Sequence, residues 1–386
     1  MSLVPPAAGA GPAGDPADRF RVEPWLHYLG GLVSRCPGFW KWLGDRETGL
    51  LADRLRAIPI RRPIYVTGLA RSGSTLLLEI LARHSDTATH RYRDDPLLFI
   101  PYLWSRYLER TPRPKARAVE RAHGDGILVT PESPEAFEEV LWMAFFPDLH
   151  DPRTPAVLDG DTDHPEFETF YRDHIRKLLL VRGGTRYLAK GNYNLTRLGY
   201  LRKLFPDARF VIPVREPVWH VASLMRQHRR FCAGQRRHPR ARAHLRRVGH
   251  FELGLDRRPV NAGDSEEVAH IVELWERGAE VEGWARYWAH LHDHLAGRLA
   301  ADPQLRSAVL LVRHEEFRRT PAATVAALFA HCGLTPGADL RRETAAMVRP
   351  PSLQRPAFFS GEDLATIDRC TSDTAHRLGL GGGVAP

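Results

Sequence analysis

The hydrophobic pattern of the chain predicts an α/β fold. Apolar runs of strand length occupy residues 60–67, 186–190, 208–214 and 307–312. Segments with helical periodicity follow or separate these runs, at residues 76–84, 136–146, 198–204 and 217–229. Strands that alternate with helices favour right-handed crossovers, so we expect a parallel sheet flanked by helices.

Three further segments have their own patterns. Residues 1–18 are rich in Pro, Ala and Gly, a composition typical of disorder. Residues 19–58 show short helical patterns with many aromatic side chains, which we interpret as a helical brace. Eleven arginines within residues 226–258 mark a basic insert over 226–263, which is either a solvated loop or an acceptor-binding surface. We therefore predict a single α/β domain over residues 19–380 that carries the brace and the insert.

Two other stretches complete the outline. Residues 85–135 combine prolines with clustered charge, and we expect irregular structure there. Asp264 or Ser265 begins a long amphipathic helix, and we assign its three tryptophans, Trp275, Trp284 and Trp288, to the core.

The formal net charge of +9 over 386 residues points to an anionic ligand or surface, or to a general bias toward arginine. The four cysteines lie far apart and form no C-x-x-C pair, so neither zinc nor a disulfide framework is indicated. This cysteine usage fits a reducing cytoplasm. We find no signal peptide, and the apolar stretch from Trp25 to Leu43 is too interrupted to cross a bilayer.

The most informative motif is the glycine-containing segment from Gly68 to Thr75, which lies between a predicted strand and a predicted helix. A loop in this position gathers backbone N–H groups at a helix N-terminus and favours a bound anion. Its spacing copies the nucleotide-binding P-loop, but Ser74 stands where that motif has lysine, and the cation has moved to Arg71. The sequence thus predicts a phosphate-like ligand that differs from the usual Mg-triphosphate.

A second candidate anion site follows the strand at 208–214. The strand ends at Arg215, Pro217 suits a helix start, and Ser223 lies eight residues after the arginine. Because ligands of parallel sheets bind at the carboxyl ends of the strands, both candidate sites should lie on the same sheet edge.

Together these segments resemble the P-loop-type sulfotransferases that use 3'-phosphoadenosine 5'-phosphosulfate (PAPS). The resemblance rests on GLARSGSTLLLEILARH at 68–84, FVIPVREPVWHVAS at 210–223, and the strand and helix over 308–334. It implies that Arg71, Ser72, Gly73, Ser74 and Thr75 hold the 5'-phosphosulfate. It also implies that Arg215 and Ser223 hold the 3'-phosphate.

The resemblance also suggests catalytic residues. Lys190, at the end of a strand, would join Arg71 as a second cation on the transferring group. Small-molecule members of the family have a histidine two residues after this lysine, whereas this chain has Asn192. Carbohydrate- and tyrosine-modifying members use a glutamate soon after the first helix, and the nearest carboxylate here is Asp94, with Asp95 and His90 as alternates.

The sequence therefore predicts sulfuryl transfer from PAPS to an acceptor hydroxyl, on a glycan or another bulky compound, in the cytoplasm. We expect no catalytic metal, since the candidate strands end in Val214-Arg215 and Val312-Arg313 rather than in Asp. The alternatives are a Mg-dependent P-loop kinase with a degenerate loop and a non-enzymatic polyanion binder. We expect no nucleic-acid partner and no transmembrane segment, and the sequence does not indicate an oligomeric state.

Overall fold

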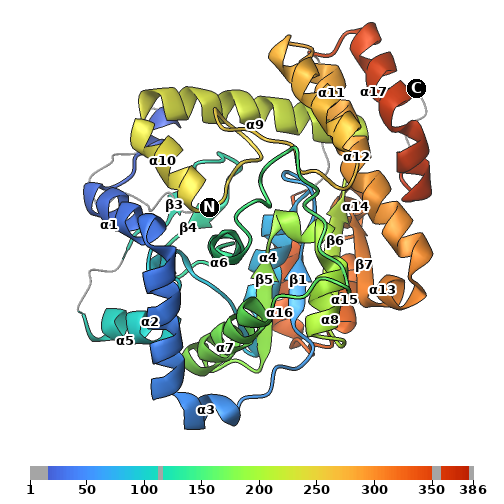
Figure 1. The fold of residues 1–386 in the computed structure, drawn as a ribbon. Coiled ribbons are helices and arrows are strands. Elements are labelled where there is room, and N and C mark those ends of the chain that lie inside the picture. Colours follow the sequence, from blue (N-terminus) through green and yellow to red (C-terminus); the bar gives the residue numbers. More distant parts are fainter. Residues whose placement is uncertain (1–15, 112–115, 350–357, 382–386) are drawn as a thin grey trace.

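The computed structural model describes residues 16–111, 116–349 and 358–381. A parallel five-stranded sheet lies at its centre, in the order β2-β5-β1-β6-β7. The strands are β1 (Ile64–Val66), β2 (Thr87–Ala88), β5 (Arg186–Lys190), β6 (Arg209–Val214) and β7 (Val309–Arg313). Helices cover the sheet (Figure 1), and the predicted α/β class is confirmed.

Alternation along the strands divides the core between the two sheet faces. Ile64 and Val66 of β1 pack with α4 (Ser74–Ala82) and α15 (Pro321–Cys332) on one face. Tyr65, which points to the opposite side, joins a larger hydrophobic cluster to which several other helices contribute. These helices are α6 (Glu138–Phe145), α7 (Pro165–Arg182), α8 (Leu198–Leu204), α9 (Pro217–Arg237) and α12 (Glu280–Ala301).

The N-terminal brace consists of α1 (Pro24–Arg35), α2 (Pro37–Leu50) and α3 (Ala52–Arg56), after a 3₁₀ turn at Pro16–Phe20. In Figure 1 these blue helices lie along one side of the molecule, with α2 and α3 beside α7 and with α1 beside α10 (Pro239–Arg247). The disorder predicted for residues 1–18 falls almost wholly outside the described residues.

The predicted basic loop proves to be helical. The arginine-rich stretch continues α9 as far as Arg237 and then forms α10. Phe231, Ala241 and Leu245 are buried, and arginine has good intrinsic helix propensity. Anchoring by these apolar residues therefore gives helices whose arginines can remain partly in solvent, and the prediction of a solvated loop was wrong.

The long tryptophan-bearing helix is divided in two. It forms α11 (Ser265–Glu276) and α12, with a turn at residues 277–279 where Gly278 takes a φ of 82°. The side chain of Asp264 caps α11 by accepting a hydrogen bond from the amide of Glu267. Trp284 and Trp288 are fully buried and Trp275 is nearly so, which confirms their assignment to the core.

Several elements escaped prediction. The stretch 85–135 contains α5 (Pro101–Arg110) and a small hairpin of β3 (Val119–Glu120) and β4 (Leu128–Val129). The long helix α7 was also missed.

The remaining elements are the 3₁₀ turns Tyr92–Asp94 and Asn192–Thr196 and the helices α13 (Pro303–Ala308), α14 (His314–Arg319), α16 (Ala338–Ala346) and α17 (Gly361–Arg377). Within the described residues, no helix is long and apolar enough to cross a membrane.

Candidate active site

The loop from Gly68 to Thr75 joins β1 to α4 in a conformation that needs its glycines. Gly73 has a φ of 110°, in the left-handed region, and Arg71 has a φ of 73°. A Cβ at Gly68 would lie 3.1 Å from the carbonyl oxygen of Pro213, so the loop packs closely against β6. The first N–H groups of α4 have no partner within the helix, an arrangement that favours a bound anion.

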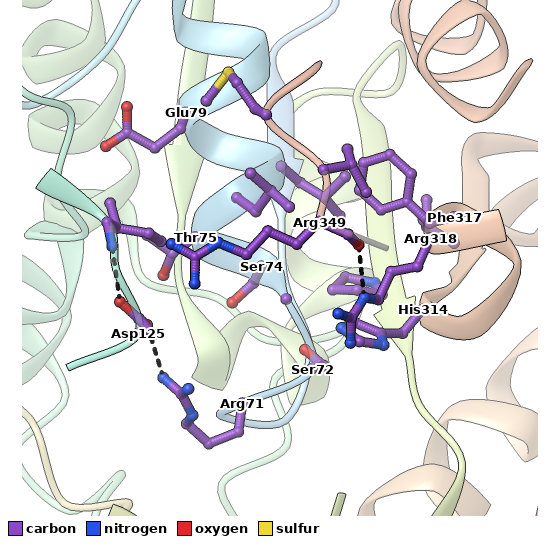
Figure 2. Close-up of a pocket in the computed structure, with 18 of the residues that line it drawn as sticks. Arg71, Ser72, Ser74, Thr75, Glu79, Asp125, His314, Phe317, Arg318 and Arg349 are labelled. Carbon is purple, nitrogen blue, oxygen red and sulfur yellow. Dashed lines mark hydrogen bonds and ion pairs between the residues drawn. The ribbon is translucent and has the colours of Figure 1, made fainter. Parts of the chain in front are cut away.

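One cavity of about 560 Å³ brings the predicted binding residues together. Figure 2 shows Arg71, Ser72, Ser74 and Thr75 along one side of this cavity, with His314, Arg318 and Arg349 on the other. All seven predicted donor-binding residues line it, namely Arg71, Ser72, Gly73, Ser74, Thr75, Arg215 and Ser223. The two anion sites that the sequence suggested therefore share one cavity.

Two of the arginines that line the cavity, Arg71 and Arg215, are connected to the second candidate anion site and to each other by hydrogen bonds. The Nε of Arg71 donates to the Oγ of Ser223 over 3.5 Å, and Nη1 of Arg215 donates to the carbonyl of Arg71 over 3.4 Å. Burial lowers the pKa of both guanidinium groups, that of Arg215 to about 10. The carboxylate of Glu315 lies 4.0 Å from Arg215. An anion that entered the cavity would therefore meet two dehydrated positive charges.

The hairpin of β3 and β4 contributes an acid and a cation that the sequence analysis missed. Asp125 lies 3.1 Å from Nη1 of Arg71 and 2.5 Å from Nη2 of Arg121. Arg121 also donates to Thr75 Oγ1 over 3.2 Å. The two arginines hold the pKa of Asp125 well below its usual range despite the opposing effect of burial. Nothing in the irregular pattern of residues 85–135 signalled that this segment reaches the loop.

Glu79 adds a carboxyl group to the upper wall of the cavity in Figure 2. It lies one turn beyond Thr75 on α4, and its Oε1 is buried without a hydrogen-bond partner among the described residues. Burial, and then the neighbouring Glu135, raise the pKa of Glu79 to about 7. Its charge therefore changes near neutral pH.

A comparison with known protein families identifies the chain. The model described as "Sulfotransferase family" matches residues 63–257, which is just over half of the chain and includes both anion sites.

The chain belongs to the sulfotransferase family.

The family membership makes this protein an enzyme of sulfuryl transfer. It disfavours the kinase and the non-enzymatic polyanion binder that the sequence left as alternatives.

Solved structures of bacterial sulfotransferases resemble this one. STF1 from Mycobacterium tuberculosis H37Rv is 17% identical over 94% of this chain and 90% of its own, with a TM-score of 0.46. STF9 from Mycobacterium avium is 14% identical over 87% and 82%, with a TM-score of 0.49. A sulfotransferase from Alicyclobacillus acidocaldarius is 17% identical over 81% and 96%, with a TM-score of 0.36. No curated protein matches the chain.

In this sulfotransferase, Lys190 ends the strand β5, where it pairs in register with Val66 of β1 just before the loop. It does not line the cavity itself. Within the described part of the chain its ammonium group makes no hydrogen bond, while the charges of Glu135, Arg121, Glu252 and Arg71 act on it. Burial lowers its pKa. Lys190 therefore lies behind the loop, with carboxylates and arginines around it.

Asp94 does not reach the cavity. Its side chain is 1% exposed, lies 2.5 Å from Nη2 of Arg182 and accepts from the backbone N–H of Arg91 over 2.8 Å. His90 Nδ1 lies 3.4 Å away, and these partners hold the pKa of Asp94 well below its usual range. The two alternate candidates for the base are also buried. His90 is 2% exposed and contacts His174 at 3.0 Å, and Asp95 is 7% exposed. These contacts place Asp94 in a buried ion-pair network and not on the wall of the cavity.

A different acidic group, Glu252, is connected to the loop through Asn192, although it is also buried and does not line the cavity itself. Ser74 Oγ donates to Asn192 Oδ1 over 3.4 Å, and Asn192 Nδ2 donates to Glu252 Oε1 over 2.8 Å. The second oxygen of Glu252 is buried without a hydrogen bond to any described residue and lies 3.6 Å from Nε2 of His250. The backbone N–H of Phe251 donates to the hydroxyl of Tyr193 over 3.0 Å, which fixes the segment against the loop. The sequence analysis missed Glu252 because it falls inside the basic insert.

Proposed function

We propose that this sulfotransferase transfers a sulfuryl group from PAPS to an acceptor hydroxyl. The observation that carries the proposal is the shared cavity, in which Arg71 of the loop and Ser223 of the second anion site are in hydrogen-bond contact. A donor with a phosphosulfate at one end and a 3'-phosphate at the other needs two such sites within the length of one nucleoside.

The residues of the cavity fit this donor. Ser72 Oγ and Arg215 Nε are buried polar atoms without a hydrogen-bond partner among the described residues, and both can donate to a phosphate oxygen. The backbone of Gly73, Ser74 and Thr75 would hold the 5'-phosphosulfate at the start of α4. Arg215 and Ser223 would hold the 3'-phosphate through a charge-assisted hydrogen bond and a hydroxyl.

The transfer is an in-line displacement in which the acceptor oxygen bonds to sulfur while the bond from sulfur to the 5'-phosphate oxygen breaks. The departing oxygen keeps the electron pair. Arg71 would stabilise the negative charge that spreads over these oxygens as a fixed donor, as in phosphoryl transfer, and Lys190 would add its positive charge from behind the loop. This arrangement supplies the positive charge from side chains, so the proposal includes no metal ion.

We assign the acceptor proton to Glu252 rather than to Asp94. Asn192 fixes one oxygen of Glu252 at 2.8 Å, and the other oxygen has no hydrogen-bond partner among the described residues. The pKa of Glu252 is lowered, first through His250 and Asn192 against the effect of burial, so the carboxylate is ionised at neutral pH. His250 Nε2 lies 3.6 Å from this second oxygen. Asn192 would then serve to position the base instead of acting as one.

The acceptor that we propose is a bulky hydroxyl compound such as a glycan, and the compartment that we propose is the cytoplasm. The carboxylate base supports the first assignment. The four free thiols of Cys36, Cys232, Cys332 and Cys370 support the second.

Transfer of isotopically labelled sulfate from PAPS to a panel of saccharides, lipids and phenols tests the proposed function directly. We expect labelled product without added magnesium. Failure of adenosine 3',5'-bisphosphate to bind in calorimetry would contradict the proposed donor, whatever the acceptor.

A further inference from the structure

Helices α1 and α2 carry apolar side chains on two opposite sides. Leu26 and Val33 of α1 and Trp40 of α2 are buried in the core. Of the other large apolar residues of these helices, Leu50 ends α2 and is 76% exposed, and five more have between 49% and 68% of their surface exposed. This set, the aromatic face, consists of Trp25, Tyr28, Leu32, Phe39 and Trp42.

The outward residues of α1 form a stripe. Trp25, Tyr28 and Leu32 stand at positions i, i+3 and i+7, so they lie along one side of the helix. A helix that is apolar on both its inner and outer sides is normally covered on both. On α2, the exposed rings of Phe39 and Trp42 lie 5.7 Å apart between centroids, tilted by 32°. The aromatic face therefore has the composition of a contact surface.

The edge of the aromatic face is positively charged. Arg35, Arg240 and Arg247 all act electrostatically on His27 of α1, and they join burial in lowering its pKa. Arg247 also donates to the carbonyl of His27 over 2.7 Å, which fixes α10 beside α1 (Figure 1). Neither α1 nor α10 contains an aspartate or glutamate. On α2, Arg46 lies 5.3 Å from the ring of Trp42.

Exposed aromatic side chains beside a positively charged edge fit one kind of partner. Tryptophan and tyrosine beside arginine are typical of helices that lie in the headgroup region of a bilayer, and anionic headgroups complement the arginine edge. We propose that the aromatic face of α1 and α2 docks this enzyme on an anionic lipid bilayer without crossing it. Arg35 of α1 and Arg240 of α10, which the proposed reaction does not use, then serve as headgroup contacts, whereas Arg242 and Arg246 of α10 are paired with Asp256.

Sedimentation with lipid vesicles tests this proposal on the full chain. We expect binding to vesicles of phosphatidylcholine mixed with phosphatidylglycerol, and much weaker binding to phosphatidylcholine alone. The triple variant Trp25→Ser/Tyr28→Ser/Leu32→Ser should lose at least about tenfold in affinity for the mixed vesicles, because its apolar contacts are removed. Phe358→Ser, which removes an apolar side chain that is 47% exposed elsewhere, is the matched control and should bind like the wild type.

The charged edge has its own variants. Arg35→Gln and Arg240→Gln should each weaken binding to the mixed vesicles by about fivefold, and added salt should weaken the wild type in the same direction. Calorimetry with adenosine 3',5'-bisphosphate checks that each variant remains folded, because these residues are absent from the cavity lining.

Three results would overturn the proposal. The first is no binding of the wild type to the mixed vesicles, and the second is equal binding of the triple variant and the wild type. The third is a dimer in sedimentation equilibrium that the triple variant abolishes while vesicle binding is absent, which would assign the aromatic face to a second copy of the chain. None of these results bears on the proposed sulfuryl transfer.

Discussion

The Nε of Arg71 lies 3.5 Å from the Oγ of Ser223, although 152 positions separate the two residues along the chain. The first follows β1 and the second lies on α9, after β6. Because β1 and β6 are adjacent and parallel, their carboxyl ends lie side by side and bring the two anion sites into one cavity.

Loss of either cation should weaken donor binding. Arg71→Ala and Arg215→Ala should each reduce the affinity for adenosine 3',5'-bisphosphate by about tenfold or more, since each removes a charge-assisted hydrogen bond worth about 1.5–3 kcal/mol. Titration calorimetry measures the effect. Arg313→Ala is the matched control, because Arg313 also ends a strand of the sheet but does not line the cavity. Wild-type affinity in both cavity variants would contradict the two-site arrangement.

Removal of the lysine behind the loop should affect the reaction more than binding. We expect Lys190→Met to lower the turnover number by about 10²–10³, because fixed positive donors act mainly on charge that develops during transfer. The affinity for adenosine 3',5'-bisphosphate should change much less, because Lys190 does not line the cavity. Steady-state kinetics together with calorimetry separates the two effects. A large loss of affinity with unchanged turnover would assign Lys190 to donor binding instead.

Glu252→Gln should reduce turnover by about 10²–10⁴ while the donor affinity stays close to that of the wild type, because general base catalysis contributes about that much. The measurement is the turnover number at saturating donor and acceptor. Unchanged turnover would exclude Glu252 as the proton acceptor.

Asp94→Asn is the comparison for that variant, and it should act on stability. Against the effect of burial, the hydrogen bond with His90 and then the ion pair with Arg182 lower the pKa of Asp94. The stabilising effect of these contacts is therefore present at neutral pH and is lost as the pH falls below about 4. Denaturant unfolding should therefore show a smaller free energy of unfolding for the variant at pH 7, and the difference should shrink in acid. The turnover number of the folded variant should equal that of the wild type. A large loss of turnover would restore Asp94 as a catalytic candidate.

Donor affinity should fall as the pH rises through about 7. Below that pH, Glu79 is neutral, and above it, Glu79 adds a negative charge to the wall of a cavity that we assign to a phosphorylated ligand. Calorimetry with adenosine 3',5'-bisphosphate at pH 6 and pH 8 measures the difference. Glu79→Gln should flatten this dependence and bind at pH 8 at least as well as the wild type. An identical pH dependence in the variant would exclude Glu79 as its source.

The parts of the site that could be predicted are those with a local signature. Gly68 and Gly73 surround a loop between a strand and a helix, and the spacing of Arg215 and Ser223 is visible in a single strand-to-helix segment. Both signals follow from backbone geometry within a few residues. The positions of Asp94 and Glu252 carry no comparable signal, because a lone carboxylate has the same appearance in a structural ion pair and in an active site.

The sequence by itself determined the parallel sheet and predicted the glycine-containing loop and the strand end that meet in one cavity, since hydrophobic periodicity and glycine placement act over short distances. The tertiary structure alone decided that Arg121 and Asp125 of a distant hairpin reach the loop and that Glu252 lies behind Asn192. It also decided that α10 lies against α1. These contacts depend on how separate helices and strands pack against each other. The packing decides which groups surround each carboxylate and how deeply it is buried, and these two factors set its pKa.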